Sequence, residues 1–213
     1  MEFGEEFTLR EYIADGVIHG LGVLAAGAGA TVLVIWAAMS GPMGHLPPIM
    51  AYAAGLLASF LLSAAYNMTL HRQARSVLRR FDHAAIFIMI AGTYTPLALI
   101  GIGGTNGMAL NMAVWTIAVL GVTMKLFFFG RFERFTFQLT LMQGWLAVLA
   151  IGPLIASFSL PVLILLVGGG VLFTLGTLFH LRDHLPFNRA IWHSHVLVGA
   201  AMHYAAVFLI LRG

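Results

Sequence analysis

The chain has 213 residues, of which 60% are hydrophobic and only 9% are charged. Soluble domains carry roughly 25% charged residues, so this composition excludes a soluble protein and predicts an integral membrane protein. The formal net charge is +3, there is no cysteine, and the arginines lie between apolar runs. This pattern excludes disulfides and thiolate ligands, and it argues for membrane topology over nucleic-acid binding, so membrane lipids are the expected partners.

Seven apolar runs are long enough to cross a bilayer, since a spanning helix needs about 20 apolar residues. They cover residues 16–38, 48–70, 82–101, 107–129, 136–156, 160–181 and 190–211. The segments between them leave no room for a second domain. The sequence therefore predicts an all-α integral membrane protein, one seven-transmembrane-helix bundle over residues 1–213. Pro96 and Pro153 lie inside runs and predict kinks.

The basic residues are distributed very unevenly between the two sides of the predicted bundle. All of the Lys and Arg residues except Arg212 fall before the first run, in the arginine-rich turn predicted at 71–81, around 125–135 or in 182–189. These segments alternate onto one side of the membrane. Because cytoplasmic segments collect Lys and Arg, the N-terminus is predicted inside the cell and the C-terminus outside.

Polar side chains gather at the same ends of the apolar runs. They form three i, i+4 pairs, which are Asp15 with His19, Ser63 with Asn67, and Arg189 with His193. Residues four apart share a helix face. Asp82 is predicted to open the third span. Polar groups at membrane depth are costly, so their convergence predicts a functional pocket at the cytoplasmic end.

Other polar residues have simpler interpretations. His83 and His184 lie at helix ends, where polar groups reach the lipid headgroups. His203 is deep in the last run and is more consistent with a hydrogen-bonded core histidine. The arginines of 72–80 are explained by topology and by attraction of anionic lipid.

Several motifs keep a recognisable order along the chain. They are Asp15-Gly-Val-Ile-His19-Gly-Leu-Gly22, Ser63-Ala-Ala-Tyr66, Arg79-Arg-Phe-Asp-His83, Ala91-Gly-Thr-Tyr-Thr-Pro96, and Ile191-Trp-His193 followed by Gly199 and His203. In these motifs the chain resembles the hemolysin III proteins, the bacterial branch of the progestin and adipoQ receptor superfamily. The resemblance implies a seven-helix bundle with a cytoplasmic N-terminus, in a bacterial inner membrane.

The resemblance also implies a zinc site near the cytoplasmic face. A Ser-x-x-x-His motif in the second span and a His-x-x-x-His motif in the seventh would supply three histidine ligands, and an aspartate of the third span would hold the metal-bound water. Ser63, Asp82 and His193 match this pattern. Asn67 and Arg189 stand where the two other histidines would be, and arginine cannot ligate a metal.

Three hypotheses for function follow. The first expects no cofactor: the zinc site is modified or vestigial, Arg189 takes the metal's place beside Asp82, and the protein acts in membrane or lipid homeostasis or sensing. The second is a metal-dependent lipid amide or ester hydrolase, with zinc held by His193 and by His19 or His71 as substitute ligands, and with Asp82 and Ser63 as catalytic residues. The third is a pore-forming cytolysin, although no span carries a polar stripe along its length.

Overall fold

The computed structural model describes residues 8–182 and 184–212, and in these residues the chain is helical with no strand. The elements are α1 (Leu9–Ser40), η1 (Met43–His45), α2 (Leu46–Met68), α3 (Arg72–Pro96), η2 (Leu97–Ile102), α4 (Gly104–Phe127), α5 (Glu133–Gly144), η3 (Leu146–Ala150), α6 (Ile151–Ser157), α7 (Leu160–His180) and α8 (Asn188–Arg212). Seven helical segments in this part of the chain are long and apolar enough to cross a membrane. The predicted fold class is confirmed.

The first helix begins before the apolar run that was predicted to start at residue 16. Thr8 and Glu11 form a capping box, in which the Thr8 backbone N–H donates to the Glu11 carboxylate (2.9 Å) and Glu11 N–H donates to the Thr8 hydroxyl (3.3 Å). This arrangement satisfies donors that a helix start leaves without partners. As a result, Asp15 lies on a regular helix, in register with His19.

The arginine-rich segment is helical, so its prediction as a turn over 71–81 is wrong. The connection between α2 and α3 is only Thr69–His71, and α3 starts at Arg72. Residues 72–80 contain no glycine or proline, and Arg, Ala, Gln and Leu favour helix. Asp82 therefore does not open the third helix but lies ten residues into it, about 15 Å along its axis.

The two internal prolines, which were predicted to kink their spans, lie beside irregular helix. After Pro96 the chain continues as the π-helical element η2, in which Gly103 N–H donates to Ala98 O (2.9 Å). The fifth span consists of α5, η3 and α6, and Pro153 lies in α6 just after η3. Proline lacks the N–H for the carbonyl four residues earlier and its ring clashes there. For Pro153 that carbonyl belongs to Leu149, within the irregular stretch.

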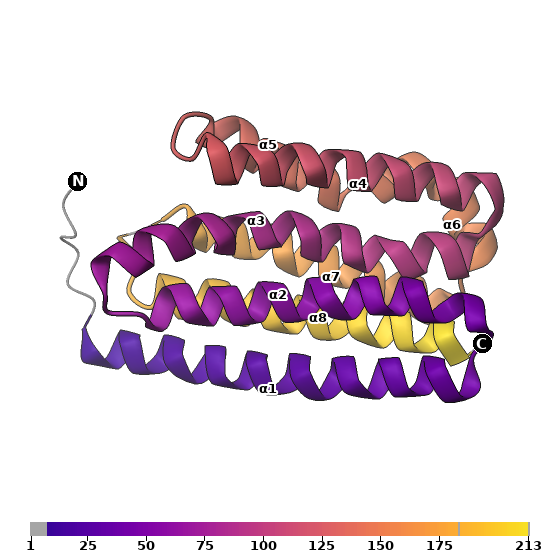
Figure 1. Cartoon of the computed structure of the whole chain (residues 1–213), viewed down its shortest axis with the longest axis horizontal. Helices are drawn as coiled ribbons and strands as arrows, with labels where there is room; N and C mark the ends of the chain where they lie inside the picture. Colours follow the sequence, from indigo (N-terminus) through magenta and orange to yellow (C-terminus); the bar gives the residue numbers. More distant parts are fainter. Residues whose placement is uncertain (1–7, 183, 213) are drawn as a thin grey trace.

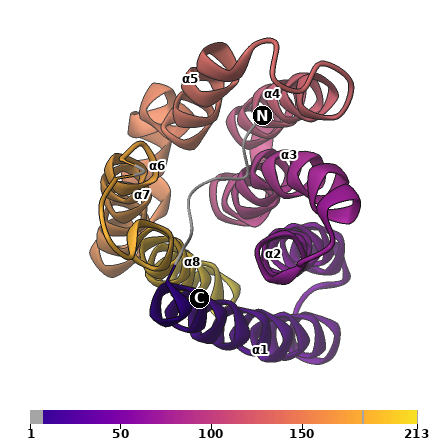
Figure 2. The ribbon, with the colours of Figure 1, turned by 90° about the vertical axis from the view of Figure 1, so that its left-hand side faces the viewer.

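The helices form a ring in which the first and last are neighbours. Figure 1 shows the long helices side by side, and Figure 2, viewed along them, shows α1 between α2 and α8. The segment formed by α3 and η2 is the most buried of the seven spans. Gly55 and Gly92 allow α2 and α3 to approach, because an added Cβ on either would lie 2.9 Å from a backbone oxygen of the other helix. Small residues commonly permit such contacts between membrane helices.

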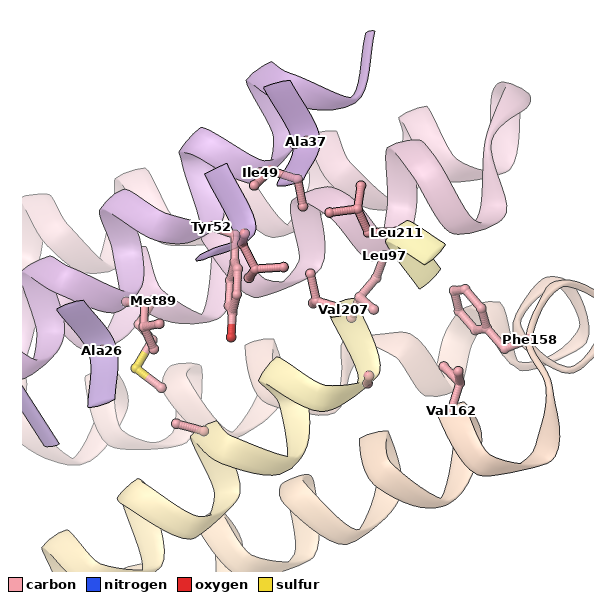
Figure 3. Packing of buried hydrophobic residues seen from close by; sticks show 14 of the residues in the cluster. Ala26, Ala37, Ile49, Tyr52, Met89, Leu97, Phe158, Val162, Val207 and Leu211 are labelled. Carbon is pink, nitrogen blue, oxygen red and sulfur yellow. The ribbon is translucent and has the colours of Figure 1, made fainter. Parts of the chain in front are cut away.

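An apolar core fills the half of the bundle that is far from the start of α1. Tyr52, Leu97 and Val207 belong to it, from α2, η2 and α8 (Figure 3). At the opposite end lie the start of α1 and the connections α2–α3, α4–α5 and α7–α8, at the left of Figure 1. All basic residues except Arg212 are in or beside these segments, and we call this end the basic end.

Candidate metal centre

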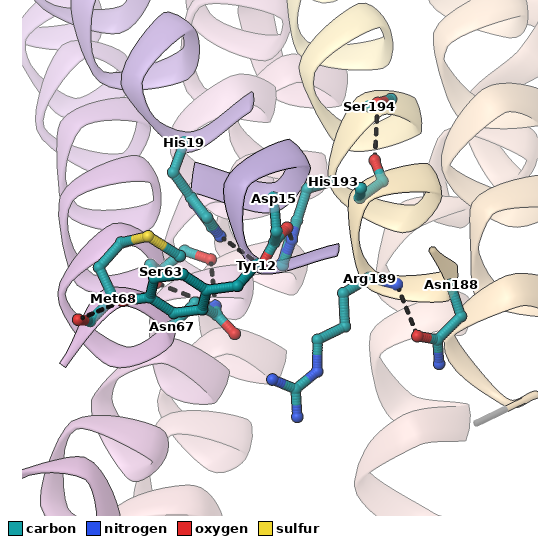
Figure 4. A network of polar contacts seen from close by, with 11 residues as sticks. Tyr12, Asp15, His19, Ser63, Asn67, Met68, Asn188, Arg189, His193 and Ser194 are labelled. Carbon is teal, nitrogen blue, oxygen red and sulfur yellow. Dashed lines mark hydrogen bonds and ion pairs between the residues drawn. The ribbon is translucent and has the colours of Figure 1, made fainter. Parts of the chain in front are cut away.

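Two histidines and an aspartate meet at the basic end, between α1 and α8. Nδ1 of His193 lies 2.6 Å from Oδ1 of Asp15, and Nε2 of His19 lies 3.6 Å from Oδ2 of the same carboxylate. The two imidazole rings are tilted by 55°, with centroids 4.3 Å apart. Asp15 and His19 are each only 4% exposed. Figure 4 shows the carboxylate of Asp15 between the two rings.

The local sequence explains why α1 presents these side chains to the bundle. The buried residues of α1 recur every three or four positions and form one stripe, which consists of Asp15, His19, Gly22, Ala26, Ala30, Leu33 and Ala37. Such spacing places side chains on a single helix face. The stripe is made mostly of small and apolar residues, and its two polar members lie together at the basic end.

The three side chains have the composition of a metal site. Their ligand atoms all lie within 4.8 Å of one another. Two atoms each about 2 Å from one zinc ion are no more than about 4 Å apart, so the group is close to the required spacing. Nε2 of His19 is also buried without a hydrogen-bond partner among the described residues, which costs about 1–3 kcal/mol if it stays unsatisfied. The residues present therefore fit a divalent metal such as zinc.

The predicted residues of α2 and α3 lie beside this cluster. The Asn67 amide donates to Ser63 O (3.0 Å) and lies 3.4 Å from the Ser63 hydroxyl. Asp82 is a hydrogen-bond partner of Ser63, and the charged groups acting on its carboxylate are His19 and Arg79. The structure therefore brings together Ser63, Asn67 and Asp82, with Asp82 close enough to His19 to interact with it.

Arg189 lies one helical turn before His193 and acts on it electrostatically. Its backbone N–H donates to the Asn188 side chain (2.8 Å). In Figure 4 its guanidinium extends away from the Asp15–His193 pair. The ion pair between Arg189 and Asp82 that the sequence suggested stays a prediction.

His71 is not part of the cluster. It is exposed, and its Nδ1 accepts a hydrogen bond from Ala74 N–H (3.3 Å) at the start of α3. His203 contacts Leu166 O through Nε2 (3.1 Å), as a core histidine would. Of the two proposed substitute ligands, the structure places only His19 beside His193.

A pocket opens next to the metal centre at the basic end. Its lining consists of Glu11, Tyr12, Asp15, Asn67, Phe187, Asn188, Arg189 and Ala190. The start of α1 fastens the loops around it, because the Glu11 carboxylate accepts from Phe187 N–H (2.9 Å) and the Tyr12 hydroxyl donates to Met68 O (3.0 Å). Phe187 has a φ of 58°, which is strained for a bulky residue.

Sequence reasoning did not propose Asp15 as a ligand. Its i, i+4 relation to His19 was visible, but its partner His193 is 178 residues away. The signal available in the sequence was an acidic residue four positions before a histidine, at the start of the first apolar run.

Comparison with known proteins finds the same family that the sequence motifs resemble. A family model described as "Haemolysin-III related" matches residues 7–204. The "Hemolysin-3 homolog" of Bacillus subtilis (strain 168) is 37% identical over 207 residues, which cover 97% of each chain. "Hemolysin-3" of Bacillus cereus is 34% identical over 199 residues, covering 93% of this chain and 91% of the relative. The human "Monocyte to macrophage differentiation factor" is 26% identical over 163 residues, covering 74% and 67%.

Proposed function

Because this chain belongs to the haemolysin-III related family of membrane proteins, we propose that it is a metal-dependent hydrolase with an altered ligand set. In this proposal Asp15, His19 and His193 hold a zinc-like ion, and the substrate is a lipid amide or ester from the bilayer. The observation that carries the proposal is the convergence of these side chains within 4.8 Å of one another.

The altered ligand set follows from the substitutions on α2 and α8. Asn67 and Arg189 replace two histidines that the resemblance implies, which leaves His193 as the shared ligand. Asp15 and His19 of α1 lie beside His193 and would supply one oxygen and one nitrogen. Two imidazoles and a carboxylate are a known catalytic zinc set, which leaves a further coordination position for water.

The neighbouring residues of α2 and α3 suit proton transfer. A bound zinc ion would supply a water nucleophile of lowered pKa. The Asp82 carboxylate is the nearby group that can hold a proton, and the Ser63 hydroxyl orients it by a hydrogen bond. The Asn67 amide donates a hydrogen bond to Ser63 O and so holds its own side chain beside Ser63, in the last turns of α2. Asp82 and Ser63 thus keep the catalytic roles suggested by the sequence.

The cellular placement is part of the same proposal. The basic end faces the cytoplasm, because Lys and Arg collect on that side of membranes. The N-terminus is then inside and the C-terminus outside. The relatives from two Bacillus species support a bacterial inner membrane as the location.

A second candidate function is favoured by the direct 2.6 Å contact between Asp15 and His193. A charged hydrogen bond of this kind holds α1 against α8 without any metal. The protein would then be a non-enzymatic member of the family with a vestigial site, acting in membrane homeostasis or sensing. This is the cofactor-free hypothesis that the sequence also suggested.

Metal content separates the two candidates. The protein is purified without chelators, incubated with zinc, desalted and measured by elemental analysis, alongside His19→Ala, His193→Ala and the control His71→Ala. We expect about one zinc per chain in the wild type and in His71→Ala, and loss in the other two variants. Zinc-free wild-type protein would support the metal-free candidate. Loss of zinc in His71→Ala would instead place the ion elsewhere. Hydrolysis of a panel of fluorogenic acyl amides and esters then tests the activity.

A further inference from the structure

Three cationic side chains surround one phenylalanine at the basic end, where α3 and α4 meet. The guanidinium carbons of Arg79 and Arg80 lie 5.4 and 5.9 Å from the centroid of the Phe129 ring, and Nζ of Lys125 lies 5.7 Å from it. The His83 ring contacts the same phenylalanine edge-on, at 5.5 Å between centroids. We call Arg79, Arg80 and Phe129 the arginine shelf.

The shelf carries an excess of positive charge. Lys125 is buried and ion-paired to Glu133, and the second oxygen of Glu133 accepts Gly130 N–H (2.9 Å). Glu133 is therefore already engaged. Within residues 8–182 and 184–212 no carboxylate lies within ion-pair distance of Arg79 or Arg80. Asp82 acts on Arg79 only from beyond that distance, and one carboxylate does not balance two guanidinium groups. Two like charges beside one ring repel each other, and an anion between them would remove that cost.

The position of the shelf indicates what kind of anion it would bind. It lies where α3 and α4 reach the basic end, beside the exposed aromatic residues Phe81, Phe127 and Phe128. Exposed apolar side chains next to arginines match a molecule with a negative head and hydrocarbon chains. Arginine also binds phosphate oxygens in a bidentate manner.

We propose that the arginine shelf is a binding site for the phosphate group of an anionic phospholipid. The phosphate contacts both guanidinium groups, and the acyl chains lie along the outer faces of α3 and α4. The site shares no residue with Asp15, His19 and His193, and its test measures lipid binding, so a failure of the metal proposal leaves this one standing.

Lipid binding to the purified protein tests the proposal. The probes are phosphatidylglycerol and phosphatidylcholine of identical acyl chains, and glycerol 3-phosphate as a headgroup without chains, measured by native mass spectrometry in detergent. The variant is Arg79→Gln/Arg80→Gln. The control is Arg131→Gln/Arg134→Gln, which removes the same charge from exposed positions of the same end. Circular dichroism and size-exclusion chromatography verify that each variant is folded.

We expect the wild type to prefer phosphatidylglycerol to both other probes. The shelf variant should bind it roughly 10- to 30-fold more weakly, from the loss of two arginines near the surface, while the control changes less than about threefold. If folded variants of both kinds lose equal affinity, the arginines act only as general surface charge and the proposal is wrong. Equal binding of the two lipids, or of glycerol 3-phosphate, would also overturn it. If the shelf variant is not folded, Phe129→Leu replaces it: weakened binding supports the site, and unchanged binding contradicts it.

Discussion

The carboxylate of Asp15 and the imidazole of His193 are joined across 178 residues, with Oδ1 and Nδ1 2.6 Å apart. Each residue lies in the second turn of its helix, one in the first helix and the other in the last. Their contact closes the ring of helices at the basic end. Since His19 contacts the same carboxylate, the contact that closes the bundle is also the centre of the candidate metal site.

Breaking this contact should destabilise the bundle. Asp15→Asn keeps the size of the side chain but removes its charge, and we expect a loss of about 1–3 kcal/mol in the free energy of unfolding. In a double-mutant cycle with His193→Gln, the coupling energy should fall between about 0.5 and 3 kcal/mol. Thermal unfolding in detergent with chelator measures the protein contact alone.

A neighbouring residue supplies the control for this cycle. Among the residues that the structure describes, Ser194 hydrogen-bonds only within its own helix, to Ala190 O at 2.6 Å. Ser194→Ala should therefore show no coupling with Asp15→Asn. A coupling near zero between Asp15 and His193 would mean that the two helices are held together elsewhere.

The sequence was sufficient for the fold because the bilayer imposes one dominant constraint on chain composition. Seven apolar runs give seven spans, and the i, i+4 spacing correctly placed Asp15 with His19 on one face. Helix spacing does not show which helix faces meet. The resemblance directed attention to Asn67 and Arg189 on α2 and α8, whereas the structure brings His193 into contact with α1.

The error at 71–81 has a different origin. The segment was interpreted by its charge, which reports membrane topology, and not by its lack of helix-breaking residues. The arginines extend from the surface of a continuous helix from Arg72 to Pro96. Charge indicates where a helix leaves the membrane, but not where it ends.

Close contact between α2 and α3 gives a steric prediction. An added Cβ on Gly92 would lie 2.9 Å from Ala51 O and 3.4 Å from the Cα of Tyr52, and a backbone cannot move aside as a side chain can. Gly92→Ala should therefore destabilise the protein by about 1–3 kcal/mol. Gly20→Ala is the control, because an added Cβ there has nothing within 4 Å. The two melting temperatures, measured in one detergent, should differ clearly; equal values would show that the α2–α3 contact is not tight.

Two hydrogen bonds from the start of α1 should each slow the local opening of a different connecting segment. Glu11→Ala removes the acceptor of Phe187 N–H, and Tyr12→Phe removes the donor to Met68 O. Loss of either hydrogen bond should accelerate local opening of the segment that it holds. We expect faster hydrogen exchange at 185–189 in Glu11→Ala and at 68–71 in Tyr12→Phe. An equal increase in both loops in both variants would indicate one general loosening of the basic end.

Restoring the histidines at Asn67 and Arg189 should give the metal a second set of ligands. Both residues line the pocket that also contains Asp15, and Arg189 is one turn before His193. In the wild-type background His19→Ala should abolish zinc binding. In Asn67→His/Arg189→His the three histidines on α2 and α8 should hold zinc without His19, because three imidazoles suffice for a catalytic zinc site. Elemental analysis of four proteins, with and without His19→Ala in each background, measures this. Zinc that stays dependent on His19 in the restored background would show that α2 and α8 are too far apart to share an ion.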